Sequence, residues 1–396
     1  MLIEITDLSV QAEGIGHIEG GKAVFVPGTL PGDLARIEIA EDRGRFAKGR
    51  LISIEEASPD RIEPACKICG ECGGCPLMSL SYEAQLRWKE KKLRDALTRI
   101  AGIEVPLIRR IIASPLTQRY RNKASFALEG NRAGYRARGS HRLVEPADCL
   151  LIGKDMTQAV KDAAGAMKPS QKYFTGLTVR RAYDGSLMII KEAGDGSVQA
   201  DRRILKDHIV TDMGTLETEV SPLSFYQVNP SACSLLYSKV QEYAEPGPGD
   251  TILDLYCGAG SIGLSMAGSC ARVIGVESVK PAVIDANRNA VINGIVNAVF
   301  ICGKAEEVVY TKLQGIKADI VILDPPRAGC RPELLKAVAD IAPRKLVYVS
   351  CEPSTLCRDI KILMSYGFEF AEATPTDMFP NSIHIETIVL LQKSNS

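Results

Sequence analysis

The sequence has no long apolar run and no excess of either charge. None of its segments reaches the roughly eighteen consecutive apolar residues that a membrane-spanning helix needs. The first residues, Met1 to Asp7, lack the basic and apolar regions of a signal peptide, so we expect a cytoplasmic protein that contacts no membrane. Lysine plus arginine and aspartate plus glutamate each number 48, so net charge does not indicate a nucleic-acid partner. At 396 residues the chain is too long for one ordinary core, and we expect two or three domains.

Cysteine, in contrast, is abundant, with 12 residues. In a chain of cytoplasmic character this favours metal binding or catalysis over disulfides. Cys66, Cys69, Cys72 and Cys75 follow one another at steps of three, with glycines between them. This spacing is typical of an iron–sulfur cluster or a zinc site and does not decide between them. Because ligands in so tight a run crowd one another, the distant Cys149, which follows a proline turn, is a candidate to replace one of the four.

Although the net charge is balanced, the charged residues are unevenly distributed along the chain. Between Arg109 and Arg142 nine arginine and lysine residues face one acidic residue, Glu129, with three aromatic residues interleaved. Arginines with aromatics in one segment suit phosphate contacts and base stacking. We therefore expect this segment to contact a nucleic acid; the alternative is a solvated strand face.

The pattern along the chain predicts three domains. Residues 1–57 alternate short β-like runs with glycine turns, which indicates a small OB-like barrel that binds RNA or serves as a plain structural domain. Residues 58–220 combine the cysteines, a helix from Ser81 to Ile100 and further β-like runs, which indicates a central α+β domain. Strands and helices alternate over 221–396, which predicts a doubly wound parallel sheet and an α/β class.

Three apolar runs in this last segment end in residues able to do chemistry. One ends at Asp254 and leads into a glycine loop that includes Gly258, a second leads into Asp324, and a third leads into Ser350 and Cys351. Ligands of open α/β sheets bind beyond the carboxyl ends of the strands, so we expect one shared pocket. Glu277 ends a further strand, where its carboxylate can accept hydrogen bonds from both hydroxyls of a ribose.

Cys351 could be a core thiol, a metal ligand or a nucleophile. Its place after a strand argues against the first, and no cysteine or histidine stands at ligand spacing to support the second. A nucleophilic thiolate needs a partner base, for which Glu386 is the candidate and His384 the rival. This pair suits methylation of uracil at C5: thiolate addition at C6 makes C5 nucleophilic, and a base then removes the C5 proton.

The chain resembles the RNA 5-methyluridine methyltransferase family, in particular its iron–sulfur branch that modifies 23S ribosomal RNA. The motifs that carry the resemblance are Phe225-Tyr226-Gln227-Val228-Asn229, Asp254-Leu255-Tyr256-Cys257-Gly258, Glu277, Asp324-Pro325-Pro326-Arg327 and Ser350-Cys351 before Pro353. The resemblance implies Cys351 as nucleophile and Glu386 as proton acceptor. It also implies S-adenosylmethionine as methyl donor, held by Gln227, Tyr256, Gly258, Glu277 and Asp324.

The same resemblance extends to the other two segments. It implies an RNA-binding TRAM barrel at the N-terminus. It further implies a 4Fe–4S cluster with four ligands, Cys66, Cys72, Cys75 and Cys149, which leaves Cys69 as an extra. We expect 23S ribosomal RNA as the substrate, with transfer RNA as the alternative, and a monomeric enzyme. The chain departs from the family pattern in three places: Glu352 replaces the usual asparagine, the late His-His-Val-Glu element reads Ile383-His384-Ile385-Glu386, and Cys357 stands where a small residue is common.

Three other functions fit the sequence less well. Enzymes that methylate exocyclic amines usually place an aromatic residue where Arg327 stands. Cytosine C5 methyltransferases place a cysteine after a Pro-Pro-like element, and none is present. A non-catalytic iron–sulfur protein that binds RNA would have no need of a complete donor pocket with nucleophile and base.

Overall fold

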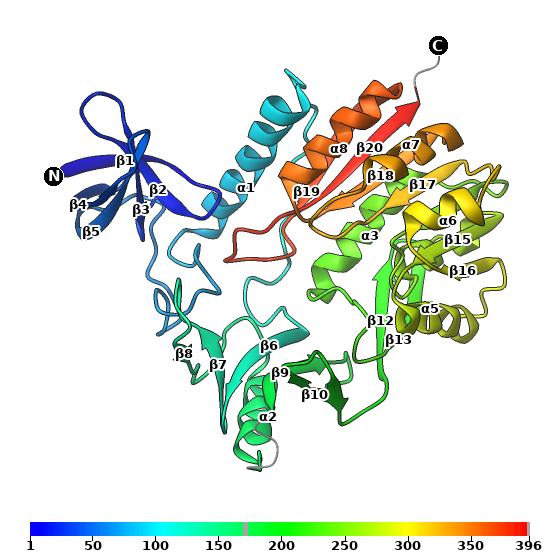
Figure 1. Cartoon of the computed structure of the whole chain (residues 1–396), viewed down its shortest axis with the longest axis horizontal. Helices are drawn as coiled ribbons and strands as arrows, with labels where there is room; N and C mark the ends of the chain where they lie inside the picture. Colours follow the sequence, from blue (N-terminus) through cyan, green and yellow to red (C-terminus); the bar gives the residue numbers. More distant parts are fainter. Residues whose placement is uncertain (169–172, 394–396) are drawn as a thin grey trace.

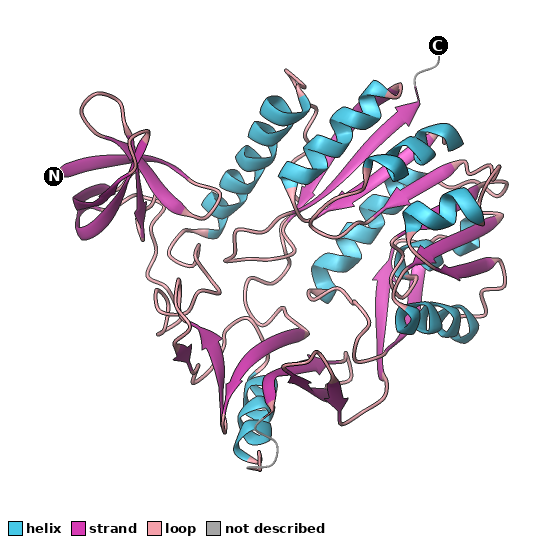
Figure 2. Cartoon of the chain, in the orientation of Figure 1, coloured by secondary structure: helices cyan, strands magenta, loops and turns pink. Residues whose placement is uncertain are grey.

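The protein is described by a computed structural model that covers residues 1–168 and 173–393. A barrel from the N-terminus, a central sheet and a larger C-terminal sheet lie around a middle region crossed by loops, with one helix between the barrel and the C-terminal sheet (Figure 1). Helices cluster on the C-terminal sheet, whereas the barrel consists of strands and loops (Figure 2). No helix in the described residues combines the length and the apolar character needed to cross a membrane.

The N-terminal strands close into a barrel in the order β1-β2-β3-β5-β4. Their bounds are β1 Leu2–Leu8, β2 Glu13–His17, β3 Ala23–Pro27, β4 Leu34–Asp42 and β5 Phe46–Glu56. Side chains along a strand alternate between its two faces, so residues such as Val24 and Val26 point inward together and are fully buried. The expected barrel is confirmed.

The central sheet has the strand order β11-β10-β9-β6-β7-β8. Its strands are β6 Lys123–Glu129, β7 Arg132–Arg136, β8 Leu143–Val144, β9 Phe174–Arg181, β10 Leu187–Ala193 and β11 Val198–Ala200. Helix α2 (Lys154–Gly165) packs on it through Met156 and Val160. A hairpin of β12 (Leu205–Thr211) and β13 (Gly214–Val220) then leads to the C-terminal part.

Helix α1 (Tyr82–Ala96) links the parts of the molecule. Ser81 caps it by accepting a hydrogen bond from the backbone of Ala84, as expected. It continues into a short π-helical turn, η1 (Leu97–Ala101), which Gly102 ends in a left-handed conformation. The widened turn rotates Ile100 out of the apolar stripe predicted for it, and Ile100 is 37% exposed.

The C-terminal sheet has the order β16-β15-β14-β17-β18-β20-β19. Its strands are β14 Thr251–Leu255, β15 Arg272–Glu277, β16 Ala298–Cys302, β17 Ile320–Leu323, β18 Lys345–Ser350, β19 Phe368–Thr376 and β20 Glu386–Lys393. Ile252 and its neighbour Leu253 belong to two different cores, one on each face. The expected doubly wound sheet is therefore confirmed. It is parallel as far as β18, while β20 runs antiparallel to β18 and β19.

Helices cover both faces of this sheet. They are α3 Pro230–Ala244, α4 Ser261–Ser265, α5 Lys280–Ile292, α6 Ala305–Thr311, α7 Pro332–Ile341 and α8 Pro353–Ser365, with a short 3-10 turn η3 at Ala267–Ser269. Leu93 and Leu97 of α1 and η1 are buried in the core that α7 and α8 share with the sheet. The helix that follows the cysteine run is thus packed against the C-terminal sheet.

Candidate active site

The strand order of the C-terminal sheet reverses beside β14. The chain moves outward from β14 through β15 to β16 and then returns to place β17 on the other side of β14. Loops after β14 and β17 therefore diverge and leave a crevice at the carboxyl edge, where open α/β sheets bind ligands. Tyr256 and Gly258 follow β14, Asp324 follows β17, and Cys351 follows β18. The three predicted strand ends meet at one edge.

A pocket lies at this crevice. Its lining consists of Phe225, Tyr226, Gln227, Tyr237, Tyr256, Cys257, Gly258, Ala259, Ser261, Ile262 and Asp324. Four residues expected at a donor site, Gln227, Tyr256, Gly258 and Asp324, are thus brought together. Tyr237, whose hydroxyl lies 2.8 Å from the Ser261 hydroxyl, was missed because nothing in a helical sequence marks one tyrosine as facing a pocket.

Glu277 stands at the rim of the pocket and is bound to the loop. Its Oε2 atom accepts a hydrogen bond of 3.1 Å from the backbone N–H of Gly258, and Oε1 accepts one of 2.7 Å from Val279. The backbone of Gly258 is left-handed, with φ of +55°. Tyr256 shares this conformation at φ +66°, which is uncommon for a residue other than glycine and indicates a loop shaped by its surroundings.

Asp254 lies behind the loop and not in the pocket. It is fully buried, and its Oδ2 atom accepts a 3.0 Å hydrogen bond from the N–H of Gly263. A side chain on Gly263 would place its Cβ 2.9 Å from this oxygen, so glycine is required there. Burial raises the pKa of Asp254 to about 7.

Cys351 and Glu386 lie at the same edge because of the register between two antiparallel strands. Ser350 of β18 pairs with Thr387 of β20, so the next residue along β18 and the preceding residue of β20 both stand at this end. Cys351 is half-buried and Glu386 is 4% exposed. The two residues predicted as nucleophile and base are neighbours.

Burial favours the uncharged forms of both Cys351 and Glu386. The pKa of the Cys351 thiol is raised to about 11, mainly by burial and also by the Glu386 carboxylate, while the charge of Arg327 and its hydrogen bond oppose the rise. Burial also raises the pKa of Glu386 well above its usual range, with a further rise from the charge of Asp324. Burial raises the pKa of Asp324 as well. Arg327 is thus the one residue of the group that favours the thiolate.

Arg327 also determines the state of His384. Its Nη2 atom lies 3.2 Å from Nε2 and 3.3 Å from Nδ1 of the imidazole. Burial and, second, the charge of Arg327 together lower the pKa of His384 to about 4. A neutral histidine whose ring nitrogens contact Arg327 is better suited to orienting that arginine than to the role of base.

The loop between β19 and β20 is held from outside the sheet. Figure 1 shows it reaching into the middle of the molecule, toward α1. Lys89 of α1 donates to Asp377 and to the carbonyl of Phe379, and Lys92 donates to the carbonyl of Ile383 at 3.0 Å. Neither lysine was predicted from the sequence, because in a helix with many charges neither stands out.

The cysteine run forms a second, separate cavity. Cys66, Cys69, Cys72, Cys75 and Cys149 line it together. The Tyr135 hydroxyl donates to Cys149 Sγ at 3.5 Å. Across residues 1–168 and 173–393, however, no three histidine, cysteine or acidic side chains converge as they would around a single metal ion.

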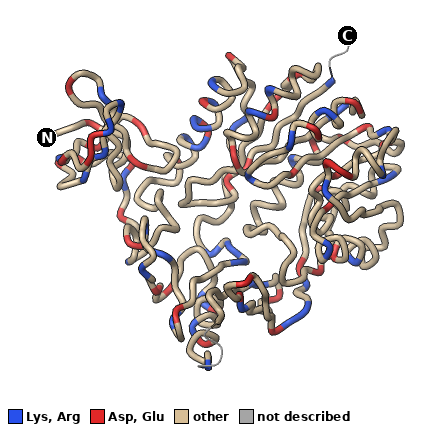
Figure 3. The backbone as a smooth tube through the Cα atoms, viewed as in Figure 1, with Lys and Arg blue, Asp and Glu red and all other residues tan. Residues whose placement is uncertain are grey.

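The basic residues between Arg109 and Arg142 have few acidic neighbours in the sequence but several in the folded protein. Several of its arginines form ion pairs with carboxylates from elsewhere in the chain, namely Arg109 with Glu372, Arg119 with Asp148, Arg132 with Glu145 and Arg142 with Glu71. Basic and acidic stretches lie beside one another over much of the trace (Figure 3). Arg121 instead lies over the rings of Tyr120 and Phe379, which joins the segment to the loop before Glu386.

Comparison with known proteins agrees with this geometry. Residues 178–394 match the family model described as tRNA (Uracil-5-)-methyltransferase, and residues 1–52 match the TRAM domain. An uncharacterized RNA methyltransferase of Halalkalibacterium halodurans is 32% identical over 99% of this chain and 97% of its own length. Another, from Caldanaerobacter subterraneus subsp. tengcongensis, is 35% identical over 99% of this chain and 97% of its own.

A solved structure matches the whole chain. The Pyrococcus abyssi tRNA (uracil-54, C5)-methyltransferase, in complex with S-adenosyl-L-homocysteine, has a TM-score of 0.77 and 26% sequence identity and covers 99% of this chain and 100% of its own. The family match extends over the crevice at the reversal of the strand order and over the edge where Cys351 meets Glu386. The chain therefore belongs to the tRNA (uracil-5-)-methyltransferase family and is an RNA methyltransferase with an N-terminal TRAM domain.

Proposed function

We propose that the protein transfers the methyl group of S-adenosylmethionine to C5 of a uridine in 23S ribosomal RNA, with Cys351 as nucleophile and Glu386 as base. The observation that carries the proposal is the register of β18 and β20, which sets these two residues side by side, next to a pocket that Asp324 lines. A thiol and a carboxylate at one base are the minimal pair for this chemistry.

The donor would occupy the crevice after β14. Gln227, Tyr256, Gly258 and Asp324 line it, and Glu277 stands at its rim with Oε1 and Oε2 anchored by backbone N–H groups. With the bond from the Ser278 hydroxyl to Oε1, three of the roughly four lone-pair sites of Glu277 are used, so it can accept from one ribose hydroxyl directly and from both once the Ser278 hydroxyl turns away. When bound, S-adenosylmethionine supplies an electrophilic methyl group on a sulfonium.

The residues of the chain would then act in sequence on the uridine. The Cys351 thiolate adds to C6, which forms an S–C6 bond and gives C5 the character of an enolate carbon. C5 takes the methyl group and the donor leaves as the neutral thioether. Glu386 removes the C5 proton, the S–C6 bond breaks, and the thiolate of Cys351 is restored. Arg327 supports the first step because its cation favours the thiolate.

The raised pKa values of Glu386 and Asp324 fit a site prepared for a cation. Without ligand, burial raises the pKa of Asp324 to about 7 and that of Glu386 well above its usual range, so both carboxyls hold protons more readily than exposed ones. A positive charge brought into the pocket beside Asp324 favours the ionised form of both groups. Binding of the sulfonium would therefore help to convert Glu386 from an acid into the base that the last step needs.

The cysteine cavity would hold a 4Fe–4S cluster through Cys66, Cys72, Cys75 and Cys149. The chemistry of the donors fits this group, since five thiols and no histidine or carboxylate ligand line the cavity. A cluster binds each cysteine through a different iron, so its ligands need not converge as they do around one ion. Its proposed role is structural: the turn after Cys75 is bonded through the N–H of Leu77 to the carbonyl of Asn381, in the loop before Glu386.

The three predicted segments would have different roles in binding and catalysis. We propose that residues 1–57 and 58–220 bind RNA and that residues 221–396 bind the donor and carry out the transfer, in a monomeric enzyme. Transfer RNA is the second candidate substrate, favoured by the likeness to the P. abyssi enzyme that acts on uracil 54 of tRNA. The cysteine run favours 23S ribosomal RNA, because it is the feature shared with the iron–sulfur branch.

The proposal is tested with RNA from a strain that lacks the gene. Purified full-length protein is incubated with labelled S-adenosylmethionine and, separately, with 23S ribosomal RNA and bulk tRNA, and 5-methyluridine is mapped by mass spectrometry. We expect label in 23S ribosomal RNA with the natural protein and none with Cys351→Ala. Label in tRNA alone would transfer the assignment to tRNA, and label in neither RNA would overturn the proposed activity.

A further inference from the structure

A large cavity lies outside the active site, where the barrel meets α1 and the start of α8. Its volume is about 410 Å³, within the range of ligand pockets in proteins. The lining comes from three parts of the chain: Asp7, Leu8, Ser9, Val10, Ile15 and Phe25 of the barrel, Trp88 to Ile100 along α1 and η1, and Glu352, Pro353 and Ser354 before and at the start of α8. None of the roles described above uses it.

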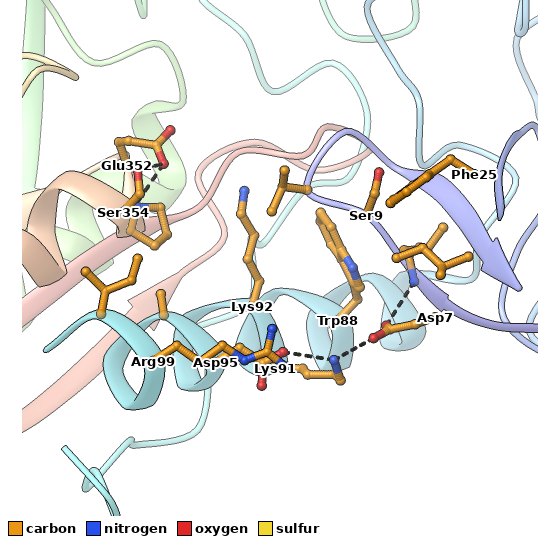
Figure 4. Close-up of a pocket in the computed structure, with 16 residues that line it drawn as sticks. Asp7, Ser9, Phe25, Trp88, Lys91, Lys92, Asp95, Arg99, Glu352 and Ser354 are labelled. Carbon is orange, nitrogen blue, oxygen red and sulfur yellow. Dashed lines mark hydrogen bonds and ion pairs between the residues drawn. The ribbon is translucent and has the colours of Figure 1, made fainter. Parts of the chain in front are cut away.

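The cavity is next to the catalytic edge. Glu352, in its wall, directly follows Cys351, and consecutive Cα atoms are only about 3.8 Å apart. Lys92, also in its wall, donates to the carbonyl of Ile383, which directly precedes His384. In Figure 4 the Lys92 side chain rises from α1 between Trp88 on one side and Glu352 on the other. A polymer bound at Cys351 would therefore pass this cavity.

Two cations in the cavity lack an ion-pair partner among the described residues, although the lining as a whole carries three cations and three carboxylates. Lys91 is paired with Asp7 at 2.8 Å and with Asp95 at 2.9 Å, which occupies those two carboxylates. Lys92, by contrast, bonds only a neutral carbonyl and lies 5.5 Å from the centre of the Trp88 ring.

Arg99 is the second free cation. It has no hydrogen-bond or ion-pair partner in the described part of the chain. It stands seven residues after Lys92, about 10 Å further along the helix axis, so the two cations would meet different phosphates. No ion pair joins Glu352 to Lys92 or Arg99 in the described residues, although its charge acts on Lys92 across the cavity; its Oε1 accepts from the Ser354 hydroxyl at 2.8 Å at the start of α8.

The opposite wall is apolar and open. On the barrel side Val10 is 60% exposed and Phe25 belongs to the same lining, while Ile100, 37% exposed, adds apolar surface on the helix side. A base has two flat apolar faces that pack against such side chains without regard to sequence.

We propose that this cavity binds the single-stranded RNA next to the target uridine, with phosphates at Lys92 and Arg99 and a base against Val10 and Phe25. The inference rests on the proposed function, since it places the neighbours of the uridine that Cys351 attacks. RNA is favoured over a protein partner because the two free cations lie along one helix face, beside an apolar wall and beside a site that acts on RNA.

The fluorescence of Trp88 can report on ligand binding in this cavity. Trp88 lines it and is the single tryptophan of the chain, so the intrinsic emission of the full-length protein comes from this place. The probe is a nine-nucleotide single-stranded RNA with 5-fluorouridine at its centre, and a second RNA carries abasic residues on both sides of that centre. Arg99→Ala is compared with Arg94→Ala, which removes an exposed arginine of the same helix that lies outside the lining.

We expect the first RNA to change the emission of Trp88 in a saturable way. Arg99→Ala should weaken binding roughly fivefold and lower the slope of log affinity against log salt by about 0.7, as loss of one phosphate contact on a single strand does. Arg94→Ala should bind as the natural protein does. The abasic RNA should lose much of the emission change.

The outcomes separate this inference from the proposed function. If the RNA forms a covalent adduct with Cys351 but leaves the emission unchanged and binds both variants equally, the cavity is not an RNA site and the proposed function stands. If the emission and the Arg99→Ala effect are as expected but no adduct forms, the cavity stands and the proposed mechanism falls. Absence of any RNA binding overturns both.

Discussion

The Nζ atom of Lys89 lies 2.6 Å from Oδ1 of Asp377, and neither side chain is exposed to solvent. This buried ion pair joins α1 to the loop that leads from β19 to Glu386. Lys89 also donates to the carbonyl of Phe379, and Asp377 accepts from the N–H of the same residue. The position of the proposed base therefore depends on a helix that lies nearly three hundred residues earlier in the chain.

Removal of the lysine should destabilise the protein strongly. Lys89→Met leaves the Asp377 carboxylate buried without its partner, which typically costs about 3–5 kcal/mol. The double variant Lys89→Met with Asp377→Asn should recover much of this loss, because no unpaired charge remains. The free energy of unfolding in urea measures both effects.

The matched control is an exposed pair of the same type. Lys336 and Asp340 lie 3.0 Å apart with both side chains 58% exposed, so Lys336→Met should cost less than about 1 kcal/mol. Equal losses for the two lysine variants would contradict the importance of the buried pair.

Asp254 should make stability depend on pH. Its pKa is raised from 3.8 to about 7 in the folded protein, so the folded state holds a proton that the unfolded state releases above about pH 4. The stability that this proton contributes is complete below the unfolded pKa and is lost as pH rises through about 7. Asp254→Asn cannot titrate and escapes this loss.

The variant should therefore gain stability relative to the natural protein between pH 4 and pH 8. The measurement is the difference in unfolding free energy between the two proteins, without donor, at both pH values. A difference that is the same at pH 4 and pH 8 would show that the buried carboxyl does not carry the proton.

The cysteine cavity predicts iron and sulfide in protein purified without oxygen. Cys75→Ser and Cys149→Ser should each lower the iron content and the visible absorbance of the cluster. Cys69→Ser should retain both, because Cys69 is the cysteine that the proposed ligand set leaves out. Cys302→Ser is the control, since this exposed cysteine ends β16 and lies outside the cavity. Zinc in place of iron would refute the cluster.

Much of the C-terminal fold could be predicted, because its signals are local. The apolar runs before Gly258, Asp324 and Cys351 became β14, β17 and β18, and the rule for ligands of open sheets placed their ends together. The antiparallel direction of β20 was not predicted. It matters, since only that direction brings the start of β20, and with it Glu386, to the edge where β18 ends.

Interactions between distant segments account for what the sequence did not reveal. The arginines from Arg109 to Arg142 look unopposed along the chain, yet partners such as Glu71 and Glu372 reach them from other elements. Lys89 looks like any helical lysine until Asp377 is seen against it. Periodicity reports which side of a helix is apolar, but it carries no information on which distant charge meets a given lysine.

The covalent bond between Cys351 and the target base tests the central claim most directly. RNA carrying 5-fluorouridine at the methylated position cannot lose fluorine from C5 as a proton is lost, so the S–C6 bond should persist. We predict an adduct that survives denaturation, maps by mass spectrometry to the peptide containing Cys351, and is absent with Cys351→Ala. An adduct of equal yield in the alanine variant, or methylation of ordinary RNA by that variant, would contradict the account.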